Sequence, residues 1–505
     1  MALDLAALQK ELTGGRPIGS VSVDAIGTYL RSPFNLWAEL HAPATERQHV
    51  SGFDALVRDV SIAHRERIMA LHYPDLPLPP SRDHLASFSA LLAGMAAGER
   101  GFRRFPLLWN GGDLWGEPAV VVRTDTQPSR FGTWSYSVVH LTLARTLRAE
   151  HLVPAMTYNM LLSKVQGTLP THVTLIDGHG ASHAIAYAPE VVHKTLTEVR
   201  KVINGEPVRP IRGGALAPWD DYCDRLAREA HDVSLVSGVG ASAVAQLESL
   251  GIKTVGNLAK ADIASLKALK RVGETRAKNW VASAQVLQEG KPRRVGPVSL
   301  PSEGSVAFLD FESTVALGDS GLGLDEHTVP PIDYLIGLLE CTPAQPIGPT
   351  SGTFRAFVAH TPQQEGAAFA QFLEWFEHRR RPILIHWGSY EKTRLNRLFD
   401  LYAESHPLRE RVLASLVNLH DLCKGGWILP TYGYGLKEIG KYLGYRWRDA
   451  EVNAMQAVVH YLEYQKNPTE FADLLQKILD YNEDDLRATA RVYQWLVQQE
   501  QAAAR

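Results

Sequence analysis

The most informative pattern of apolar and polar positions in the chain is V-A-F-L-D-F-E-S-T, residues 306–314. Four residues that favour extended structure lead directly into Asp310 and Glu312, which predicts a strand with two acids near its end. Alternate residues of a strand point to the same side of a sheet, so we expect both carboxylates on one side. Such a pair can hold a hard cation. The pair can also be two solvated acids at a strand end. Whether it is a metal site depends on partner residues further along the chain.

The pattern that follows predicts an α/β domain over residues 305–505. The predicted elements are, in order, strands near 332–340 and 353–359, a helix at 362–379, a strand at 382–387, a helix that Glu391 opens, and helices at 407–417, 435–443, 454–465 and 470–498. Strands come first and helices afterwards, with a crossover helix before the fourth strand. This order resembles the RNase H-like fold.

The last predicted helix contains L-D-Y-N-E-D-D-L-R-A-T at residues 479–489. Tyr481 and Asp485 are four residues apart, so they share one face of the helix. This resembles the Tyr-x-x-x-Asp third motif of the DEDD exonucleases, whose first motif is Asp-x-Glu at the end of the first strand. Asp484 lies on nearby surface and is the alternative ligand.

The second motif departs from the family pattern. The family uses Asn, two or three residues, Phe or Tyr, and then Asp, whereas this chain has H-W-G-S-Y-E, with Trp387 or Gly388 in place of Asn and Glu391 in place of Asp. Relatives with a RecB-type front half resemble H-Y-x-x-Y-E, so we take Glu391 as a natural variant. Asp421, on a neighbouring predicted helix, is expected either to face the cleft or to cap its helix.

The resemblance implies a site for two ions, Mg²⁺ or Mn²⁺, built from five catalytic residues. We expect Asp310, Glu312 and Asp485 to bind the first ion. The second would be held by Asp310 and Glu391. Tyr481 is expected to orient the attacking water rather than to take its proton, because the ordinary pKa of tyrosine is about 10.

Residues 1–232 predict a mixed α/β domain. Strands are expected at 114–123 and 134–145, followed by a helix around 151–163 and a hairpin around 177–178. This order resembles the RecB-type PD-(D/E)xK nuclease domain, which precedes an RNase H-like exonuclease in a family of bacterial RecB-like proteins. An unrelated α/β domain is the alternative.

The acids and the lysine of that nuclease site are missing here. Ala119 and His140 stand in place of two acids and Thr142 in place of the lysine, while His64 matches a metal-binding position. A methyl group, an imidazole and a hydroxyl cannot hold or polarise a phosphate as that mechanism needs. We therefore expect a nuclease fold without catalysis. No iron–sulfur cluster is expected, because Cys223 is the only cysteine that remains of the four found in relatives.

Residues 233–290 contain two copies of one pattern: an apolar residue, a Gly-rich turn and a helix of small residues. The pattern resembles the tandem helix-hairpin-helix module, whose turns present backbone N–H groups to phosphate oxygens. Such contacts hold a strand without reading its sequence. A helical spacer is the alternative. The candidate nucleic-acid-binding residues are Gly238, Gly240, Arg271, Gly273, Arg276 and Lys278, together with Lys437 further along, although a surface lysine is the more common role. Residues 291–304 are expected to be a linker.

Composition sets limits on these interpretations. A chain of 505 residues predicts two to four domains, and no apolar run is long enough to span a membrane. The N-terminus does not resemble a signal peptide, so a cytoplasmic protein without membrane partners is expected. The net charge of −3 gives no general attraction to a polyanion, so binding must rely on local patches. The candidate patches are Arg103 with Arg104, Arg145 with Arg148, residues 291–294 and residues 379–381.

Cysteines and histidines predict no further metal site. The three cysteines are too far apart for a CxxC pair or a zinc site. The histidines His172, His179, His183 and His193 match no metal-binding spacing. We expect the latter to belong to a hairpin and its turn.

Together these features predict a metal-dependent 3′-5′ exonuclease acting on DNA that is single-stranded or has a free 3′ end, in DNA processing, repair or defence. Two alternatives stay open: a catalytically inactive nucleic-acid-binding scaffold, and an RNase that uses the same site. The chain contains no G-x-x-x-x-G-K-[ST] motif, so a helicase would have to be a separately encoded partner.

Overall fold

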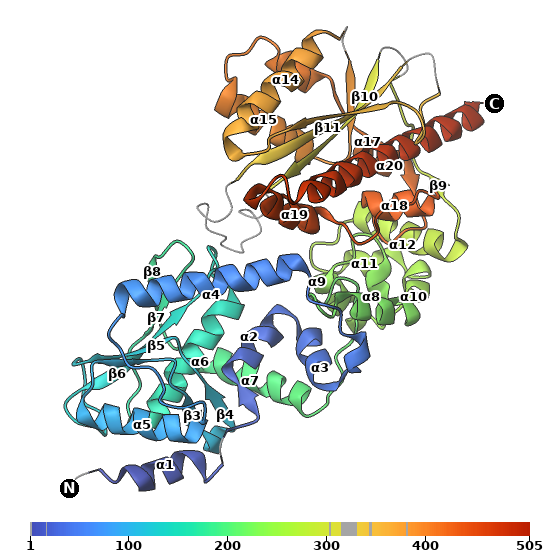
Figure 1. The fold of residues 1–505 in the computed structure, drawn as a ribbon. Coiled ribbons are helices and arrows are strands. Elements are labelled where there is room, and N and C mark those ends of the chain that lie inside the picture. Colours follow the sequence, from blue (N-terminus) through green and yellow to red (C-terminus); the bar gives the residue numbers. More distant parts are fainter. Residues whose placement is uncertain are drawn as a thin grey trace. The chain divides into compact units, whose positions relative to one another are not determined.

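The computed structural model describes residues 3–16, 18–301, 305–314, 331–342, 346–379 and 382–504 (Figure 1). Residues 302–304 of the predicted linker, and Arg380 and Arg381 of one basic patch, lie outside this range. The described chain separates into an N-terminal unit, residues 3–50 and 54–224, and a C-terminal unit, residues 225–504 with 51–53. Within the described residues, no helix has both the length and the apolar character needed to cross a membrane.

The N-terminal unit is a mixed α/β fold, as predicted. Its helices are α1 (Leu5–Thr13), α2 (Val23–Arg31), α3 (Pro33–His41), α4 (Gly52–His72), α5 (His84–Ala97), α6 (Ala149–Gln166) and α7 (Pro189–Ile203), with short 3-10 turns at Ala44–Glu46 and Asn110–Gly112. The boundary between the units, after residue 224, falls within α8 (Asp220–Glu229). Its strands are β1 (Val21–Ser22), β2 (Gly101–Arg103), β3 (Leu107–Trp109), β4 (Leu114–Gly116), β5 (Val120–Thr124), β6 (Ser135–Leu141), β7 (Val173–Ile176) and β8 (Ser182–Ile185).

The main sheet of this unit has the order β2-β5-β6-β7-β8. Strands β2, β5 and β6 are antiparallel, and α6 crosses over to β7, which is parallel to β6. The hairpin predicted around residues 177–178 is formed by β7 and β8. A second sheet has the order β1-β4-β3.

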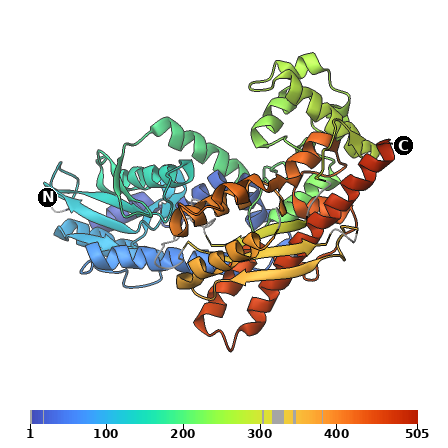
Figure 2. The same cartoon turned by 90° about the horizontal axis from the view of Figure 1, so that it is seen from above.

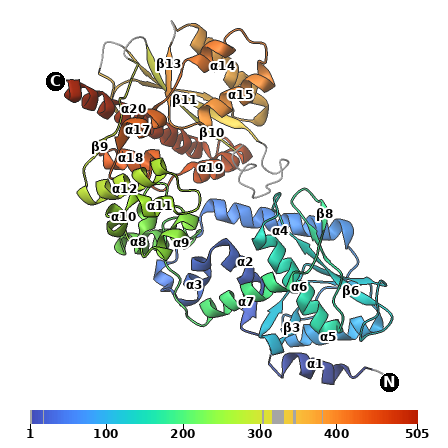
Figure 3. The ribbon, with the colours of Figure 1, turned by 180° about the vertical axis from the view of Figure 1, so that it is seen from behind.

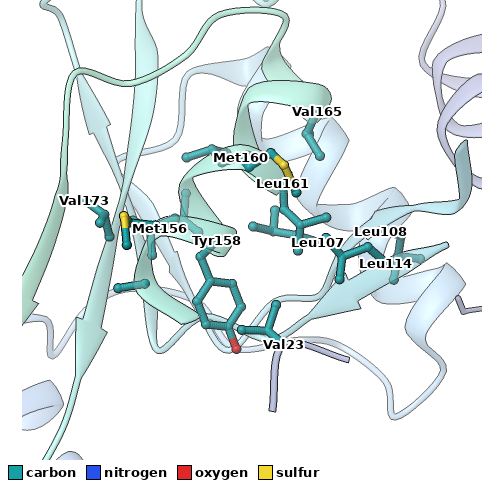
Figure 4. Packing of buried hydrophobic residues seen from close by; sticks show 14 of the residues in the cluster. Val23, Leu107, Leu108, Leu114, Met156, Tyr158, Met160, Leu161, Val165 and Val173 are labelled. Atoms are coloured by element: carbon teal, nitrogen blue, oxygen red, sulfur yellow. The ribbon is translucent and has the colours of Figure 1, made fainter. Parts of the chain in front are cut away.

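The core of the N-terminal unit forms around α6, which is buried along most of its length. Figure 4 shows Tyr158 and Leu161 of α6 against Leu107 and Leu114 of the small sheet. These side chains are at most 3% exposed. Burial of this kind stabilises a fold by about 25 cal/mol per Å² of apolar surface, so α6 fixes both sheets relative to each other.

The prediction of one continuous strand at residues 114–123 is wrong. The segment divides at Glu117 and Pro118 into β4 and β5, which belong to different sheets. Pro118 has no backbone N–H to donate to a neighbouring strand, which explains the break.

The C-terminal unit begins with a helical region: a 3-10 turn at Val233–Leu235, then α9 (Ala241–Ser249), α10 (Val255–Ala259), α11 (Ile263–Lys267) and α12 (Glu274–Glu289). Figure 3 shows these four helices gathered together. Both predicted copies are present as hairpins, one leading into α9 and the other into α12.

The rest of this unit is an α/β domain. Its strands are β9 (Arg293–Arg294), β10 (Val306–Ser313), β11 (Asp333–Cys341), β12 (Thr353–Val358), β13 (Ile383–His386), β14 (Leu416–Asn418) and β15 (Trp427–Ile428). Its helices are α14 (Glu365–Glu377, after a 3-10 turn at Pro362–Gln364), α15 (Tyr390–Tyr402), α16 (Arg409–Ala414), α17 (Leu419–Gly426), α18 (Leu436–Tyr442), α19 (Ala454–Lys466) and α20 (Ala472–Ala504).

The large sheet of the domain has the order β12-β11-β10-β13-β14, so β10 is central. β10 pairs with β11 antiparallel and with β13 parallel. The helix α20, the long red helix of Figure 2, packs on this sheet. Phe308 of β10 shares a buried cluster with Leu486 and Tyr493 of α20. Since Phe308, Asp310 and Glu312 are alternate residues of one strand, the two acids are on the side that α20 covers.

The prediction of a helix at residues 407–417 is wrong at the C-terminal end of that range. Helix α16 stops at Ala414, and residues 416–418 form β14, the fifth strand. β14 pairs parallel to β13 over only three residues. Such a short strand is hard to recognise from its local pattern, because its extended conformation comes from the neighbouring strand.

Candidate active site

Three acids from two distant parts of the chain meet where α20 crosses β10. Asp310 and Glu312 project from β10, and Asp485 projects from α20. Each offers a carboxylate oxygen, and these oxygens lie within 4.8 Å of one another. Glu312 is only 5% exposed. The structure therefore concentrates three carboxylates in a largely buried position.

The surroundings oppose ionisation of all three acids. Burial, followed by the charges of Glu312, Asp485 and Glu391, raises the pKa of Asp310 well above its ordinary value. Burial and the charge of Asp485 do the same to the pKa of Glu312. Burial is also the main reason why the pKa of Asp485 rises to about 6. Buried carboxylates this close together repel one another, so a cation between them is strongly favoured.

This donor set fits a divalent cation of the Mg²⁺ or Mn²⁺ type. Both ions prefer oxygen ligands and commonly use a few carboxylates together with water and substrate oxygens. Asp310, Glu312 and Asp485 supply such oxygens with no sulfur or imidazole among them. The chemistry of the residues, rather than any bound ion, is the basis of this assignment.

Asn482 connects two of the three acids, and we did not predict it from the sequence. Its Nδ2 lies 2.9 Å from Asp310 Oδ2 and 3.4 Å from Glu312 Oε1, so it donates to both carboxylates. The side chain is fully buried. It packs over Gly337, where an added Cβ would overlap Asn482 Oδ1. Asn482 is three residues from Asp485 on the same helix, a spacing that could have revealed it.

Two other side chains border the acid cluster. Trp447 Nε1 donates to Asp485 Oδ1 at 2.6 Å, a contact that the sequence did not predict. Lys437 is half-buried rather than an ordinary surface lysine. Its Nζ donates to the Val452 carbonyl oxygen at 2.9 Å and lies 4.9 Å from the centre of the Tyr481 ring. Burial lowers the pKa of Lys437, whereas the charges of Asp485 and Glu312 raise it.

Two known family models match parts of the C-terminal unit. Residues 307–497 match the family model described as the RNase_H superfamily. These residues form an RNase H-like superfamily domain. Residues 231–285 match the model described as a SAM-like helix-hairpin-helix tandem, so the helical region before it is a helix-hairpin-helix module. No curated protein and no solved structure matched the chain.

Glu391 lies at the start of α15 in the RNase H-like domain and is 3% exposed. Its Oε2 is 3.1 Å from Nδ1 of the buried His386, which fixes the orientation of the carboxylate. Glu391 is not among the three acids whose oxygens converge, yet its charge contributes to the raised pKa of Asp310. It therefore lies beside the cluster rather than within it.

The two alternative acids of the domain have other partners. Asp484 accepts from the Tyr445 hydroxyl at 2.8 Å and from Arg448, whose backbone N–H and Nε lie at 2.8 and 3.1 Å. Asp484 thus connects α20 to the segment between α18 and α19. The Asp421 side chain is 72% exposed and accepts from Asn418 Nδ2 at 2.8 Å. Neither belongs to the converging group.

The helix-hairpin-helix module contains two equivalent turns. Gly240 and Gly273 are the N-cap residues of α9 and α12, with nearly equal backbone angles, and a Cβ at either would meet no atom within 4 Å. Both helix N-termini are therefore open to an approaching phosphate. Gly238 and Arg271 occupy the same place in the two turns, with φ of 82° and 64°. Arg271 thus adopts a left-handed conformation that normally favours glycine.

The predicted charges of this module have different surroundings. Lys278 Nζ pairs with Glu274 Oε1 at 2.8 Å, so the positive charge of the lysine is largely offset by the glutamate. Arg276 Nη1 donates to the Arg271 carbonyl oxygen at 2.8 Å and so supports the turn. The Arg271 side chain is exposed and has no ion pair within the described residues. Of the predicted basic residues here, Arg271 is the one best placed to meet a phosphate.

The positions assigned to a former nuclease site lie in the N-terminal unit. His64 is buried on α4. Ala119 packs on a cluster formed by Ile68 of α4 and strands β5 to β7. Burial, with the charges of His151 and Arg65, lowers the pKa of His140 to about 4. Thr142 follows β6 and lines a surface pocket.

Other predicted sites have structural partners. Asp177, at the turn of the β7–β8 hairpin, accepts from the His179 backbone N–H and pairs with His183 Nε2 at 2.7 Å. Buried Cys223 donates to the Ile211 carbonyl oxygen at 3.4 Å. Most basic patches are paired with acids: Arg104 with Glu66, Arg293 with Glu289, Arg294 with Glu500 and Arg379 with Glu340.

Proposed function

We propose that the RNase H-like domain is a divalent-metal-dependent 3′-5′ exonuclease of the DEDD type that acts on nucleic acid, with DNA as the preferred substrate. The observation that carries this proposal is the convergence of Asp310, Glu312 and Asp485 within 4.8 Å. Three largely buried carboxylates repel one another, and acids with pKa values raised in this way gather at functional sites. The proposal includes a place in DNA processing, repair or defence, and a cytoplasmic location.

When bound, a divalent ion would lower the pKa of the attacking water and offset charge on the leaving 3′ oxygen. The residues around it hold the acids in place. Asn482 fixes the Asp310 and Glu312 carboxylates, and Trp447 fixes that of Asp485. Glu391, oriented by His386, would complete the set of four acids.

Tyr481 suits a role in orienting water. Burial is the main reason why its pKa lies above the ordinary value, with the charge of Asp485 acting in the same direction. A tyrosine that keeps its proton can donate a hydrogen bond but cannot act as a base. Lys437, beside the Tyr481 ring, would contact a phosphate oxygen of the strand.

The helix-hairpin-helix module supplies a sequence-independent grip in this proposal. The open helix N-termini at Gly240 and Gly273 would bind two phosphates of one strand. Arg271 would add a cation beside the second turn. Grip and cleavage would then reside in one unit of the chain.

The test uses purified full-length protein with Mg²⁺ or Mn²⁺ and single-stranded oligonucleotides. Strands labelled at the 5′ end should give a ladder of shortened products, whereas strands labelled at the 3′ end should release the labelled nucleotide first. Asp310→Asn should abolish both. Asp421→Asn is the matched control, because it makes the same chemical change at an exposed acid outside the cluster, and should retain full activity.

Uncut strands with both the unsubstituted protein and the Asp421→Asn variant would refute the exonuclease and leave a nucleic-acid-binding scaffold. Matched DNA and RNA oligomers decide the substrate, since a site that contacts phosphate does not by itself detect a 2′-hydroxyl. If RNA is shortened faster than DNA, the proposed DNase is instead an RNase that uses the same acids.

A further inference from the structure

A second candidate site lies in the N-terminal unit, at a surface pocket of about 400 Å³. Three separate segments form it: the end of α2, the middle of α4, and the loop that leads from β6 into α6. The lining residues are Arg31, Val57, Ser61, Arg65, Leu141, Thr142, Leu143, Ala144, Thr146, Arg148, Glu150 and His151. The acids of the RNase H-like domain belong to the C-terminal unit, so this pocket is formed by residues other than those of the cleavage site proposed above.

The charge of the pocket is strongly positive. Arg31, Arg65 and Arg148 contribute three guanidinium groups, against one carboxylate from Glu150. The side chains of two of these arginines donate to uncharged oxygens: Arg31 to Thr28 Oγ1 at 3.4 Å and Arg65 to the Ser61 carbonyl at 3.3 Å. Within the described chain, none of the three forms an ion pair. This distinguishes them from most basic patches of the protein, which are paired with acids.

The charges of the three arginines act on two neighbouring histidines, His151 and His140. The charges of Arg31 and Arg148 both help to lower the pKa of His151, after the larger effect of burial and against the opposing charge of Glu150. The charge of Arg65, with that of His151, lowers the pKa of neighbouring His140. Although they come from residues 31, 65 and 148, the three arginines line one pocket. Three guanidinium groups against a single carboxylate leave the pocket with a net positive charge, which favours a bound anion.

Polar groups around the arginines suit the oxygens of a phosphate. Ser61, Thr142 and Thr146 place hydroxyls on the lining. Helix α6, eighteen residues long, begins at Ala149 beside Arg148, so the positive end of its dipole points to the same place. Arginine is the cation best shaped for phosphate because its N–H groups can pair with two oxygens at once.

From this arrangement we infer that the pocket bordered by Arg31, Arg65 and Arg148 is a phosphate-binding site. Thr142 is the position at which the sequence predicts a lost catalytic lysine, so the pocket includes one of the four positions of the predicted former active site. A site that holds a metal needs acids, whereas this one is lined by cations. It would bind the phosphate anion directly and without hydrolysis.

The phosphate could belong to a nucleic-acid strand or to a free nucleotide, and direct binding measurements separate the two. The full-length protein is used in EDTA, so that no strand is cut and the outcome does not depend on the exonuclease proposal. The probes are a fluorescent single-stranded DNA, followed by anisotropy, and ADP and inorganic pyrophosphate, followed by thermal stabilisation. The test variant is Arg65→Gln combined with Arg148→Gln.

The matched control is Arg47→Gln combined with Lys201→Gln. It removes the same charge from the same unit, but at two exposed residues that already pair with Glu39 and Glu198. If the ligand is a strand, the pocket variant should bind DNA on the order of ten-fold more weakly than the control. The slope of log affinity against log salt should fall by about 1.4, for two lost phosphate contacts.

If the ligand is a free nucleotide, the pocket variant should lose stabilisation by ADP or pyrophosphate while its DNA affinity equals that of the control. Hydrogen exchange gives a readout confined to the site, because residues 142–151 of the unsubstituted protein should become protected when ligand is added. Should the pocket variant be unfolded, Thr146→Glu tests the same point by adding a negative charge at an exposed lining residue. Equal binding of all three probes by variant and control would overturn the inference.

Discussion

Asn482 on α20 donates from Nδ2 to Oδ2 of Asp310 on β10 at 2.9 Å, although the two residues are 172 positions apart in the chain. The same amide group reaches Glu312 at 3.4 Å. Because Gly337 pairs with Asp310 in the sheet, the absence of a side chain there makes room for Asn482. One amide thus determines how two of the proposed metal ligands are held.

Replacement of Asn482 by Leu should reduce cleavage by at least ten-fold and raise the Mn²⁺ concentration needed for half-maximal rate. Leucine keeps the volume but removes the donor, so both carboxylates lose a hydrogen bond that favours their charged form. A merely structural role would leave the metal requirement unchanged. Asn396→Leu is the control, since among the described residues Asn396 donates only to the Lys392 carbonyl on its own helix. An unaltered Mn²⁺ titration for Asn482→Leu would refute the positioning role.

Gly337→Ala should destabilise the domain by roughly 1–3 kcal/mol, because the new methyl group overlaps Asn482 Oδ1 in a packed core. Combining it with Asn482→Ala should restore part of this loss, which a double-mutant cycle of urea unfolding measures. Gly425→Ala is the control, since a Cβ there meets no atom within 4 Å. Strictly additive effects of the two substitutions would show that the residues do not interact.

Trp447→Phe should move the acidic limb of the pH–rate profile upward. The hydrogen bond from Trp447 is one of the interactions that lower the pKa of Asp485, so its loss leaves the carboxyl protonated to higher pH. The rate should therefore fall more at pH 6 than at pH 8. Trp427→Phe is the control, because Trp427 is buried and its Nε1 has no hydrogen-bond partner in the described structure. Identical profiles for both variants would exclude this role of Trp447.

Metal-free protein should become less stable as the pH rises from about 4 to about 7. The pKa of Asp485 is raised from 3.8 to about 6 in the folded state. Its protonated form therefore contributes stability that is fully present below about pH 4 and lost as the pH rises through the folded pKa. Raised pKa values of Asp310 and Glu312 extend the loss to higher pH.

Asp485→Asn should reduce this pH dependence, and Mn²⁺ should raise the melting temperature of the unsubstituted protein more at pH 8 than at pH 5, because protons compete with the ion. Differential scanning calorimetry in EDTA and in Mn²⁺ measures both. The prediction fails if Mn²⁺ stabilises the protein equally at the two pH values.

The two equivalent turns of the helix-hairpin-helix module allow a matched pair of substitutions. Gly238→Ala should destabilise the protein by about 1 kcal/mol, since φ of 82° strains any residue with a Cβ. Arg271→Gly should not destabilise the turn, because φ of 64° suits glycine, but should weaken binding of single-stranded DNA in EDTA. Unchanged DNA affinity for Arg271→Gly would remove this arginine from the proposed binding surface.

Local sequence was sufficient to predict most elements of the C-terminal unit, although it missed the short strand β14. Alternation along residues 306–313 indicated a strand with Asp310 and Glu312 on one side, and a spacing of four placed Tyr481 and Asp485 on one helix face. The two turns of the helix-hairpin-helix module were visible as a repeat. These predictions succeed because backbone geometry fixes the direction of side chains within a single strand or helix.

The tertiary structure decided which of these side chains meet. Asp484 and Asp485 are neighbours in sequence, yet Arg448 and Tyr445 hold the first while the second joins the acid cluster. Likewise the arginines at 31, 65 and 148 have no common motif and converge only through the packing of α2, α4 and α6. Spacing in sequence fixes the direction in which side chains point within one helix or strand. The distance between side chains of different elements depends on how the faces of those elements pack. This packing determines which acids and which arginines of the protein come together.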